Sequence, residues 1–179
     1  MSFYVKKLYD NELGIRRGKI NKAGKFLLLS KKNQIVEFFP YLDSNVVKPS
    51  TSIGIIINDT RILVNAEYVY NNQSTGHKGK DRRIYLNEEI DPNGSYFKTN
   101  YYIVFFRYYD EGDNEIRYIL YRYTPEHKHY DLLEKLTEKK NHLIFEKIDF
   151  IDTSDKSFKE VKISKKTNER INDRLKRDE

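Results

Sequence analysis

Two long runs of aromatic and β-branched residues, separated by a short acidic segment, constrain the fold of this chain more than any other feature. They cover residues 101–109 and 115–123, and four acids lie together in residues 110–115. Such runs favour β-strands, and the polar, glycine-containing segment between them favours a hairpin turn. Both faces of each run carry large apolar or aromatic groups, so we expect two central strands. An exposed aromatic ladder that stacks unpaired bases is the alternative, but the β-branched neighbours favour core packing.

The other apolar runs predict a mainly β, α+β fold. Further strands are expected at residues 2–8, 24–29, 51–57, 61–70, 83–86 and 142–151. Strands and helices never alternate regularly along the chain, which argues against a doubly wound parallel sheet. The pattern therefore favours an open, mixed or antiparallel barrel of seven or eight strands.

Two short helices are predicted, at residues 31–39 and 129–140. Ser30 can cap the first helix and Pro40 ends it. Its apolar residues share one side, so it should plug a barrel end or cover a sheet face: Ile35, Phe38 and Phe39. The second helix is amphipathic, and the side chains expected to point inward are Leu132, Leu133 and Leu136.

Length and composition bound the class of protein. A chain of 179 residues suits one domain with a substantial core, and we place that domain at residues 1–152, followed by a charged tail or linker at 153–179. The absence of cysteine excludes disulfides, Cys-ligated zinc, iron–sulfur clusters and thiol catalysis. No apolar run approaches the length of a membrane span and there is no signal-peptide core. These features predict a soluble bacterial cytoplasmic protein that does not contact a membrane.

Two polar, basic segments lie between predicted strands, at residues 6–19 and 70–85. The formal net charge is +6, and residues 1–32 hold nine Lys and Arg against two acids. In the second segment Asp81 lies among four cations, Lys78, Lys80, Arg82 and Arg83. Cations suit phosphates and carboxylates accept from base amino groups, so we expect two arms that grip nucleic acid from one face.

Several short motifs along residues 3–123 carry information through their order and spacing. They are Lys6-Lys7-Leu8 with Asn11-Glu12 and Gly14, Val36-Glu37 with Phe39-Pro40, Pro49-Ser50, and Tyr70-Asn71 with Gly76 and Asp81-Arg82-Arg83-Ile84. In this order the chain resembles the DNA-binding pseudobarrel domain shared by plant B-three transcription factors and several restriction endonucleases, above all the N-terminal domain of EcoRII-type enzymes. It departs from the pattern at Gln73 and Gly79, where basic residues would be expected.

The resemblance implies a seven-stranded pseudobarrel that grips duplex DNA with two arms in the major groove. It further implies an effector or targeting domain of a type II restriction endonuclease that binds 5′-CC(A/T)GG or a related site. In that family's arrangement, Asp81 would accept from a cytosine amino group, Arg83 would contact guanine or a neighbouring phosphate, and the N-terminal arm would read bases through Asn11 and Glu12. Arg16, Arg17 and Lys19 have no counterparts, and we assign them to phosphates.

The predicted partner is therefore double-stranded DNA, with a C-terminal nuclease domain of the same protein as a further partner. We expect no catalytic activity in this chain, no cofactor for DNA binding, and Mg²⁺ only for an attached catalytic domain. The predicted DNA-binding residues are Lys7, Asn11, Glu12, Arg16, Arg17, Lys19, Gln73, His77, Lys78, Lys80, Asp81, Arg82 and Arg83.

Two other functions stay open. Asp149 with Glu160 and Lys162 has the spacing of a metal-dependent nuclease site, in which carboxylates hold the metal and a lysine helps to activate water. The other alternative is a protein-interaction module that does not bind DNA. Steep salt dependence of binding would favour DNA, and cleavage with Mg²⁺ would favour the nuclease.

Overall fold

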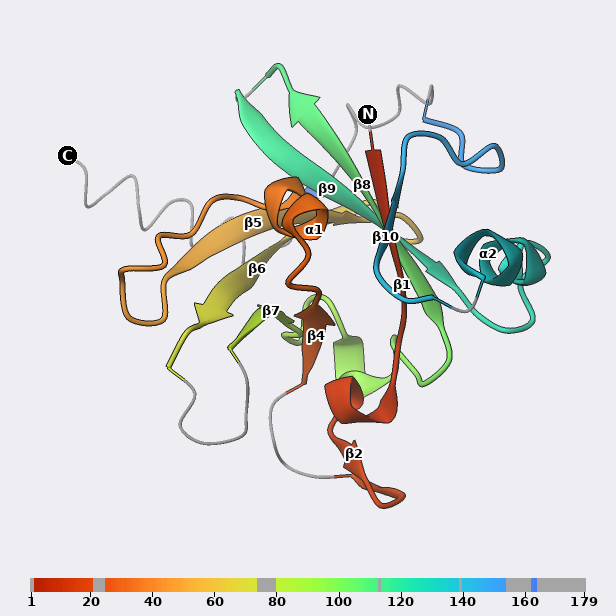
Figure 1. Ribbon diagram of the computed structural model, residues 1–179. Coiled ribbons are helices and arrows are strands. Elements are labelled where there is room, and N and C mark those ends of the chain that lie inside the picture. Colours follow the sequence, from red (N-terminus) through yellow and green to blue (C-terminus); the bar gives the residue numbers. More distant parts are fainter. Residues whose placement is uncertain are drawn as a thin grey trace.

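The computed structural model describes residues 2–20, 25–73, 80–112, 114–138 and 140–153, together with the backbone of 162–163. Within these ranges the chain forms a curled sheet, with two α-helices and a small hairpin attached to it (Figure 1). No helix in the described ranges is long and apolar enough to cross a membrane.

Eight strands follow one another in hydrogen-bonded order in the main sheet, β10-β1-β8-β9-β5-β6-β7-β4. Their bounds are β1 (Ser2–Lys7), β4 (Phe26–Leu29), β5 (Ser50–Ile57), β6 (Ile62–Asn71), β7 (Asp81–Tyr85), β8 (Tyr102–Asp110), β9 (Glu115–Tyr123) and β10 (Leu143–Phe145). A further short strand, β11 (Lys162–Ile163), pairs with β6 in parallel. The predicted mainly β open barrel is confirmed, with eight strands on the path where the resemblance implied seven.

The pairs of neighbouring strands in this sheet are mostly antiparallel. The predicted central hairpin is present, with β8 and β9 paired from Tyr102↔Tyr123 to Asp110↔Glu115. β5 pairs with β9 in parallel, and the next pairs, β5·β6, β6·β7 and β7·β4, are antiparallel. At the other end β1 lies between β8 and β10.

Four helical segments accompany the sheet in the described residues. They are the 3₁₀ turns η1 (Asp10–Leu13) and η2 (Pro92–Gly94) and the α-helices α1 (Asn33–Phe38) and α2 (Tyr130–Thr137). As predicted, α1 packs on a face of the sheet: Ile35, Phe38 and the following residue Phe39 are all at most 4% exposed and belong to a core cluster with residues of the strands. The Tyr118 hydroxyl donates to the carbonyl of Phe38 at 2.9 Å, which fixes the end of the helix over β9.

A second core lies on the other side of the sheet, under α2. Tyr130, Leu133 and Thr137 face inward, which corrects the predicted inward set: Leu132 and Leu136 are 44% and 41% exposed. The predicted strand at 142–151 is also shorter, because only β10 pairs with the sheet. Beyond it Ile148 and Ile151 are buried in this second core. The boundary between domain and tail at 152/153 stays a prediction.

Candidate nucleic-acid interface

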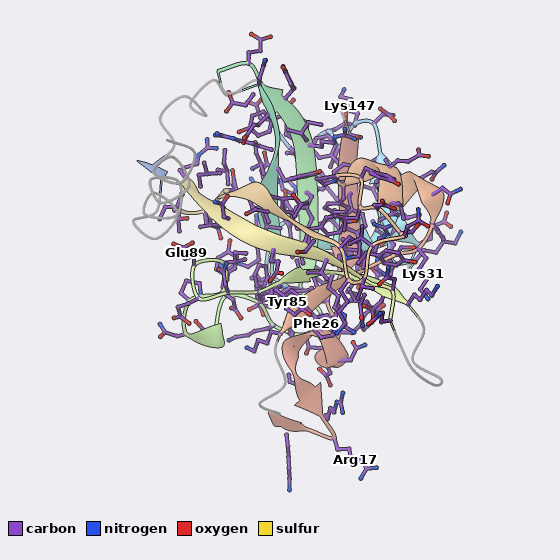
Figure 2. The ribbon with its side chains drawn as sticks, turned by 90° about the vertical axis from the view of Figure 1, so that its left-hand side faces the viewer. Arg17, Phe26, Lys31, Tyr85, Glu89 and Lys147 are labelled. Carbon is purple, nitrogen blue, oxygen red and sulfur yellow. The ribbon has the colours of Figure 1, made fainter. Side chains whose placement is uncertain are left out.

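The first arm was predicted at residues 6–19. In the structure β1 ends at Lys7 and β4 begins at Phe26, and the connection between them, residues 8–25, is called the N-arm below. It contains η1 and a two-stranded hairpin of β2 (Ile15–Arg16) and β3 (Lys19–Ile20). Two residues connect these strands, Arg17 and Gly18, with φ of 52° and 71°. Positive φ at both positions is what the tightest hairpin turns require. Figure 2 shows Arg17 at the far end of the N-arm, away from the main sheet.

The polar residues predicted for the N-arm divide into two groups. Arg16, Arg17 and Lys19 are exposed on the hairpin, and Asn11 is exposed on η1. Glu12 is different, because it is only 2% exposed. The hairpin therefore presents three cations to solvent, as a phosphate-binding role requires.

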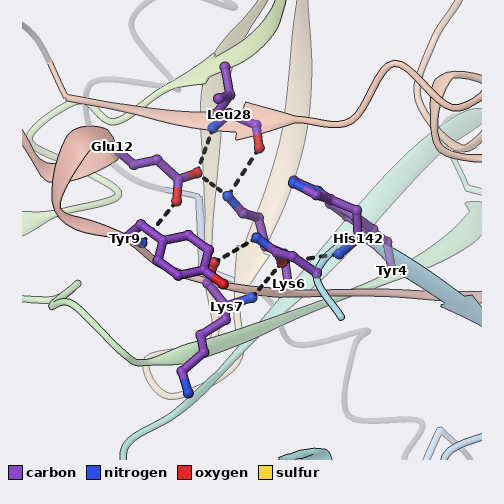
Figure 3. A network of polar contacts seen from close by, with 8 residues as sticks. Tyr4, Lys6, Lys7, Tyr9, Glu12, Leu28 and His142 are labelled. Carbon is purple, nitrogen blue, oxygen red and sulfur yellow. Dashed lines mark hydrogen bonds and ion pairs between the residues drawn. The ribbon is translucent and has the colours of Figure 1, made fainter. Parts of the chain in front are cut away.

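Glu12 forms an ion pair with Lys6, which is 1% exposed. Its carboxylate also accepts the backbone N–H of Leu28 at 2.8 Å and that of Tyr9 at 3.1 Å, while Lys6 Nζ donates to the Leu28 carbonyl at 3.0 Å (Figure 3). Burial lowers the pKa of Lys6. A carboxylate held in this way cannot meet a base edge without breaking these bonds, so the structure contradicts the prediction that Glu12 reads bases. Glu12 fastens the base of the N-arm to β4 instead.

Lys7 is the other residue that the structure places elsewhere. Its Nζ donates to Glu134 of α2 at 3.0 Å and lies 5.3 Å from the centre of the Tyr102 ring. Along β1, successive side chains point to opposite faces, and Lys7 shares its face with Phe3 and Val5 of the second core. Lys7 therefore belongs to the contact between β1 and α2, and the prediction that it contacts DNA is not supported.

The second arm was predicted at residues 70–85. In the structure β6 ends at Asn71 and β7 begins at Asp81, and the connection between them, residues 72–80, is called the C-arm. Gln73 and Lys80 are exposed at its two ends, and the predicted contacts His77 and Lys78 lie outside the described residues. Asn72 fixes its start: the amide donates to the Val46 carbonyl at 2.6 Å and accepts the Lys48 N–H at 2.9 Å. The C-arm thus leaves the sheet from a fixed base beside the loop before β5.

Asp81 and Arg83 lie on the first residues of β7, directly after the C-arm. Arg83 Nε donates to Asp81 Oδ1 at 2.5 Å and Nη2 donates to Oδ2 at 2.8 Å. These hydrogen bonds hold the pKa of the Arg83 guanidinium above its ordinary value. Asp81 and Arg83 side chains are 20% and 22% exposed, so both remain reachable from solvent.

The strand register places this pair on an outer face shared by β4 and β7. Arg83 is paired with Leu28, and Tyr85 with Phe26. The guanidinium carbon of Arg83 lies 4.2 Å from the centre of the Phe26 ring. Figure 2 shows Phe26 and Tyr85 side by side where the N-arm joins the sheet. We call Phe26, Asp81, Arg83 and Tyr85 the floor, because each arm leads directly into one of its two strands.

Arg82 points to the opposite side of β7. Its Nη1 donates to the Tyr68 hydroxyl at 3.1 Å, and its guanidinium carbon lies 4.3 Å from the centre of the Tyr70 ring. Ile84, on the same side of the strand, is fully buried. Arg82 therefore lines the end of the barrel, and of the two neighbouring arginines only Arg83 belongs to the floor.

Three residues of the interface were missed in the sequence, namely Phe26, Tyr85 and Asn72. Phe26 and Tyr85 are ordinary strand residues by composition, and their alignment with Arg83 depends on the β4·β7 register. No short-range signal predicts that register, because three other elements, α1, β5 and β6, lie between the two strands in the sequence. The Asp-Arg-Arg-Ile sequence was the available signal for the rest of the floor.

The rival metal site is only partly within the described residues. Asp149 is 86% exposed and pairs with Lys147 at 3.0 Å, whereas Glu160 and the side chain of Lys162 lie outside them. Among the side chains that the structure describes, no three His, Asp or Glu residues are grouped closely enough to hold a metal ion. The nuclease hypothesis thus gains no geometry from this structure.

Comparison with known proteins shows a shared fold. No family model and no curated protein sequence matches the chain. Among solved structures, the N-terminal domain of Helicobacter pylori LlaJI.R1 matches with a TM-score of 0.50 and 14% identity, over 83% of this chain and 100% of that one. The B3 domain of the UbaLAI restriction endonuclease, solved with cognate DNA, matches with a TM-score of 0.50 and 14% identity, over 80% and 84%. The predicted pseudobarrel fold of B3 type is confirmed.

Proposed function

We propose that this chain recognises a specific sequence in double-stranded DNA, and that it is the targeting or effector domain of a restriction endonuclease. The observation that carries the proposal is the placement of the two arms. They lead into adjacent antiparallel strands, β4 and β7, whose common outer face holds a carboxylate and a guanidinium. One structural neighbour with this fold was solved with its cognate DNA.

The chemistry of the floor and arms suits this role. The cations of the N-arm hairpin, Arg16, Arg17 and Lys19, are exposed. None of the ion pairs found among the described residues involves them, so they are available for phosphates. Phosphate contacts supply affinity that depends on salt and not on sequence. A carboxylate accepts from the cytosine amino group and an arginine donates to guanine, so the Asp81–Arg83 pair supplies groups that distinguish base pairs.

The proposed target is CC(A/T)GG or a related site, as the resemblance implies. Two adjacent G·C pairs offer the amino group that a carboxylate would accept from and the O6 and N7 atoms that a guanidinium would donate to. The nuclease domain that would use this targeting would follow the charged tail.

Binding to duplexes tests the proposal. The chain is titrated with a short duplex that contains CC(A/T)GG and with a scrambled duplex of equal length, at moderate salt with Mg²⁺, and the products are examined for cuts. A preference of about tenfold or more, equivalent to 1.4 kcal/mol, without cleavage supports specific recognition. Equal binding to both duplexes sends the search for the target to a randomised duplex library.

Three other results would contradict the proposal, each in a different way. If no sequence is enriched from the library, sequence-specific recognition is wrong. If the duplexes do not bind at all, the interaction-module hypothesis gains. If the chain nicks a plasmid in the presence of Mg²⁺ and Asp149→Ala abolishes this nicking, the chain is itself a nuclease.

A further inference from the structure

We infer that Phe26 is a positioning residue, which holds the Arg83 guanidinium in the orientation that reads a base. This inference rests on the proposed function and adds to it a residue from the other arm's strand. It starts from the Phe26–Arg83 stack, in which the guanidinium carbon is 4.2 Å from the ring centre.

The guanidinium of Arg83 is held on two independent sides. Asp81 engages one edge of its plane through two hydrogen bonds, at 2.5 and 2.8 Å. Its central carbon also lies over the ring of Phe26, 4.2 Å from the ring centre. Hydrogen bonds alone leave a guanidinium free to swing together with an exposed carboxylate, whereas a ring on its face fixes the plane as well.

Phe26 is itself fixed by its own neighbour. Its ring meets the ring of Tyr85 edge to face, with centroids 6.1 Å apart and an interplanar angle of 67°. The two residues are directly paired across β4 and β7, and Arg83 is the diagonal neighbour of Phe26 on the same face. Diagonal neighbours on one face are within reach of aromatic and long side chains. The stack is therefore set by the strand register and not by a mobile loop.

The edge of the Arg83 guanidinium that is not bonded to Asp81 is the one that would contact a base. Nε and Nη2 are engaged with Asp81, so the end-on edge formed by Nη1 and Nη2 can still present two N–H groups to guanine. A bidentate contact needs the plane of the guanidinium to match the plane of the base. By fixing that plane before DNA arrives, Phe26 lowers the ordering cost of binding.

The arrangement also couples the two arms. Phe26 is the first residue of β4, at the end of the N-arm, and Arg83 follows the C-arm on β7. The β4 strand is in turn fastened to the N-arm base through Leu28, Lys6 and Glu12. A displacement of β4 would therefore move the Phe26 ring, and with it the Arg83 side chain that we assign to base reading.

The test compares Phe26→Leu, which removes the stack, with Phe26→Tyr, which keeps it. The target duplex is the one that the wild-type chain prefers, and a random duplex is the reference. We expect Phe26→Leu to lower the preference for the target, measured as the ratio of target affinity to random affinity, roughly 3- to 10-fold, as the loss of one ordered side chain would. Phe26→Tyr, which keeps the aromatic ring, should show the same preference as the wild type.

A double-mutant cycle separates positioning from general packing. In an Arg83→Ala background, Phe26→Leu should have no further effect on preference, because the residue through which Phe26 acts is gone. Tyr109→Leu is the matched control, since Tyr109 is a strand aromatic that is 56% exposed and lies at the distant β8–β9 turn. Equal losses on target and random duplexes, or the same loss with and without Arg83, would overturn the inference.

A measurement without DNA keeps this inference separate from the proposed function. The Nε–H signal of Arg83 in a ¹⁵N-labelled sample reports how firmly the guanidinium is held. Phe26→Leu should increase the mobility of that group, and Phe26→Tyr should not. Equal mobility in all three proteins would refute positioning even if DNA is bound specifically, whereas the expected difference without any sequence preference would leave positioning intact and refute the function.

Discussion

Lys6 and Glu12 form a buried ion pair, and both partners also bond the backbone of the same residue, Leu28 in β4. β4 lies at one end of the strand path and is paired only with β7 among the described strands. The ion pair therefore takes the place of a neighbouring strand, because it satisfies an N–H and a C=O that would otherwise be unpaired. It also connects β1, the N-arm and the edge of the barrel.

The ion pair leads to a prediction about stability. Lys6→Met should destabilise the protein by about 3–5 kcal/mol, because it leaves the Glu12 carboxylate buried without a counter-charge. Lys7→Met is the matched control, since Lys7 forms a partly exposed pair with Glu134, whose side chains are 23% and 40% exposed, and such a pair should contribute about 1 kcal/mol or less. Urea unfolding of the two variants measures the difference. Equal losses would mean that the Lys6–Glu12 pair is not buried in solution.

His142 should make stability depend on pH. Its Nδ1 forms a hydrogen bond with the Tyr4 hydroxyl at 2.6 Å, and burial, together with the charges of Lys6 and Lys32, lowers its pKa to about 4. In the unfolded chain its pKa is about 6.5, so between pH 6.5 and 4 the unfolded chain binds the proton first. Stability from this group is complete above pH 6.5 and is lost as pH falls towards 4. Since His142 is partly exposed, we expect a loss of roughly 1–2 kcal/mol.

The measurement is the free energy of unfolding in urea at several pH values between 7 and 4.5. His142→Asn is the variant to compare, because His142 has a positive φ of 63° and asparagine tolerates that conformation. The difference between wild type and variant should shrink as the pH falls. Parallel curves for the two proteins would assign the acid sensitivity to other groups.

The division of roles between floor and arm predicts different effects of two substitutions. Arg83→Ala should weaken binding to the target duplex about 10- to 100-fold, the value of one bidentate base contact, and should affect random duplexes much less. Arg83→Lys keeps the charge but loses the fork, so it should behave similarly on the target. Lys19→Ala should weaken both duplexes equally.

Salt titrations provide the second readout for this division. Removal of one phosphate contact should reduce the slope of log K against log salt by about 0.9, so Lys19→Ala should have a shallower slope than wild type. Arg83→Lys should keep the wild-type slope. If both substitutions reduced target and random binding by the same factor, the assignment of reading to Arg83 and phosphate contact to Lys19 would be refuted.

Local patterns in the sequence predicted most of the strands but not the parts held by distant partners. The β8–β9 hairpin follows from its own residues, because both strands and the turn between them lie within residues 102–123. Burial of Glu12 depends on Lys6 and on the backbone of Leu28, so no local pattern indicates it. In α2 the leucines at 132 and 136 suggested an apolar side, yet Tyr130 and Thr137 complete the buried face around Leu133.

The same distinction applies to the interface. The exposed cations of the N-arm and the Asp81–Arg83 pair could be picked out from the sequence as candidates for contacts to phosphates and bases. Composition does not separate the two adjacent arginines, but the resemblance implied Arg83 as the base contact, and the alternation of β7 relative to buried Ile84 places Arg83 and not Arg82 on the floor. The contribution of Phe26 depends on a register between strands more than fifty residues apart, Phe26↔Tyr85.

Substitutions in the turn of the N-arm hairpin test the shape of the arm and its charge separately. Arg17 and Gly18 both have positive φ, and no atom lies within 4 Å of where a Cβ on Gly18 would be. Arg17→Asn should preserve the turn, because asparagine followed by glycine is favoured at these positions, and should remove one cation. We expect equal weakening on target and random duplexes. Gly18→Val has room for its side chain but strains the backbone by about 1–2 kcal/mol.

The strain should act on the arm and not on the whole protein, since the β2–β3 hairpin is a separate two-stranded sheet. Gly18→Val should therefore weaken DNA binding while the unfolding temperature stays within a few degrees of wild type, and amide exchange at Ile15 and Lys19 should become faster. Arg17→Asn should weaken binding with unchanged exchange at both positions. If Gly18→Val bound the target as tightly as wild type, the folded hairpin would not be needed for recognition, and the cations of the N-arm would act as a flexible charged segment.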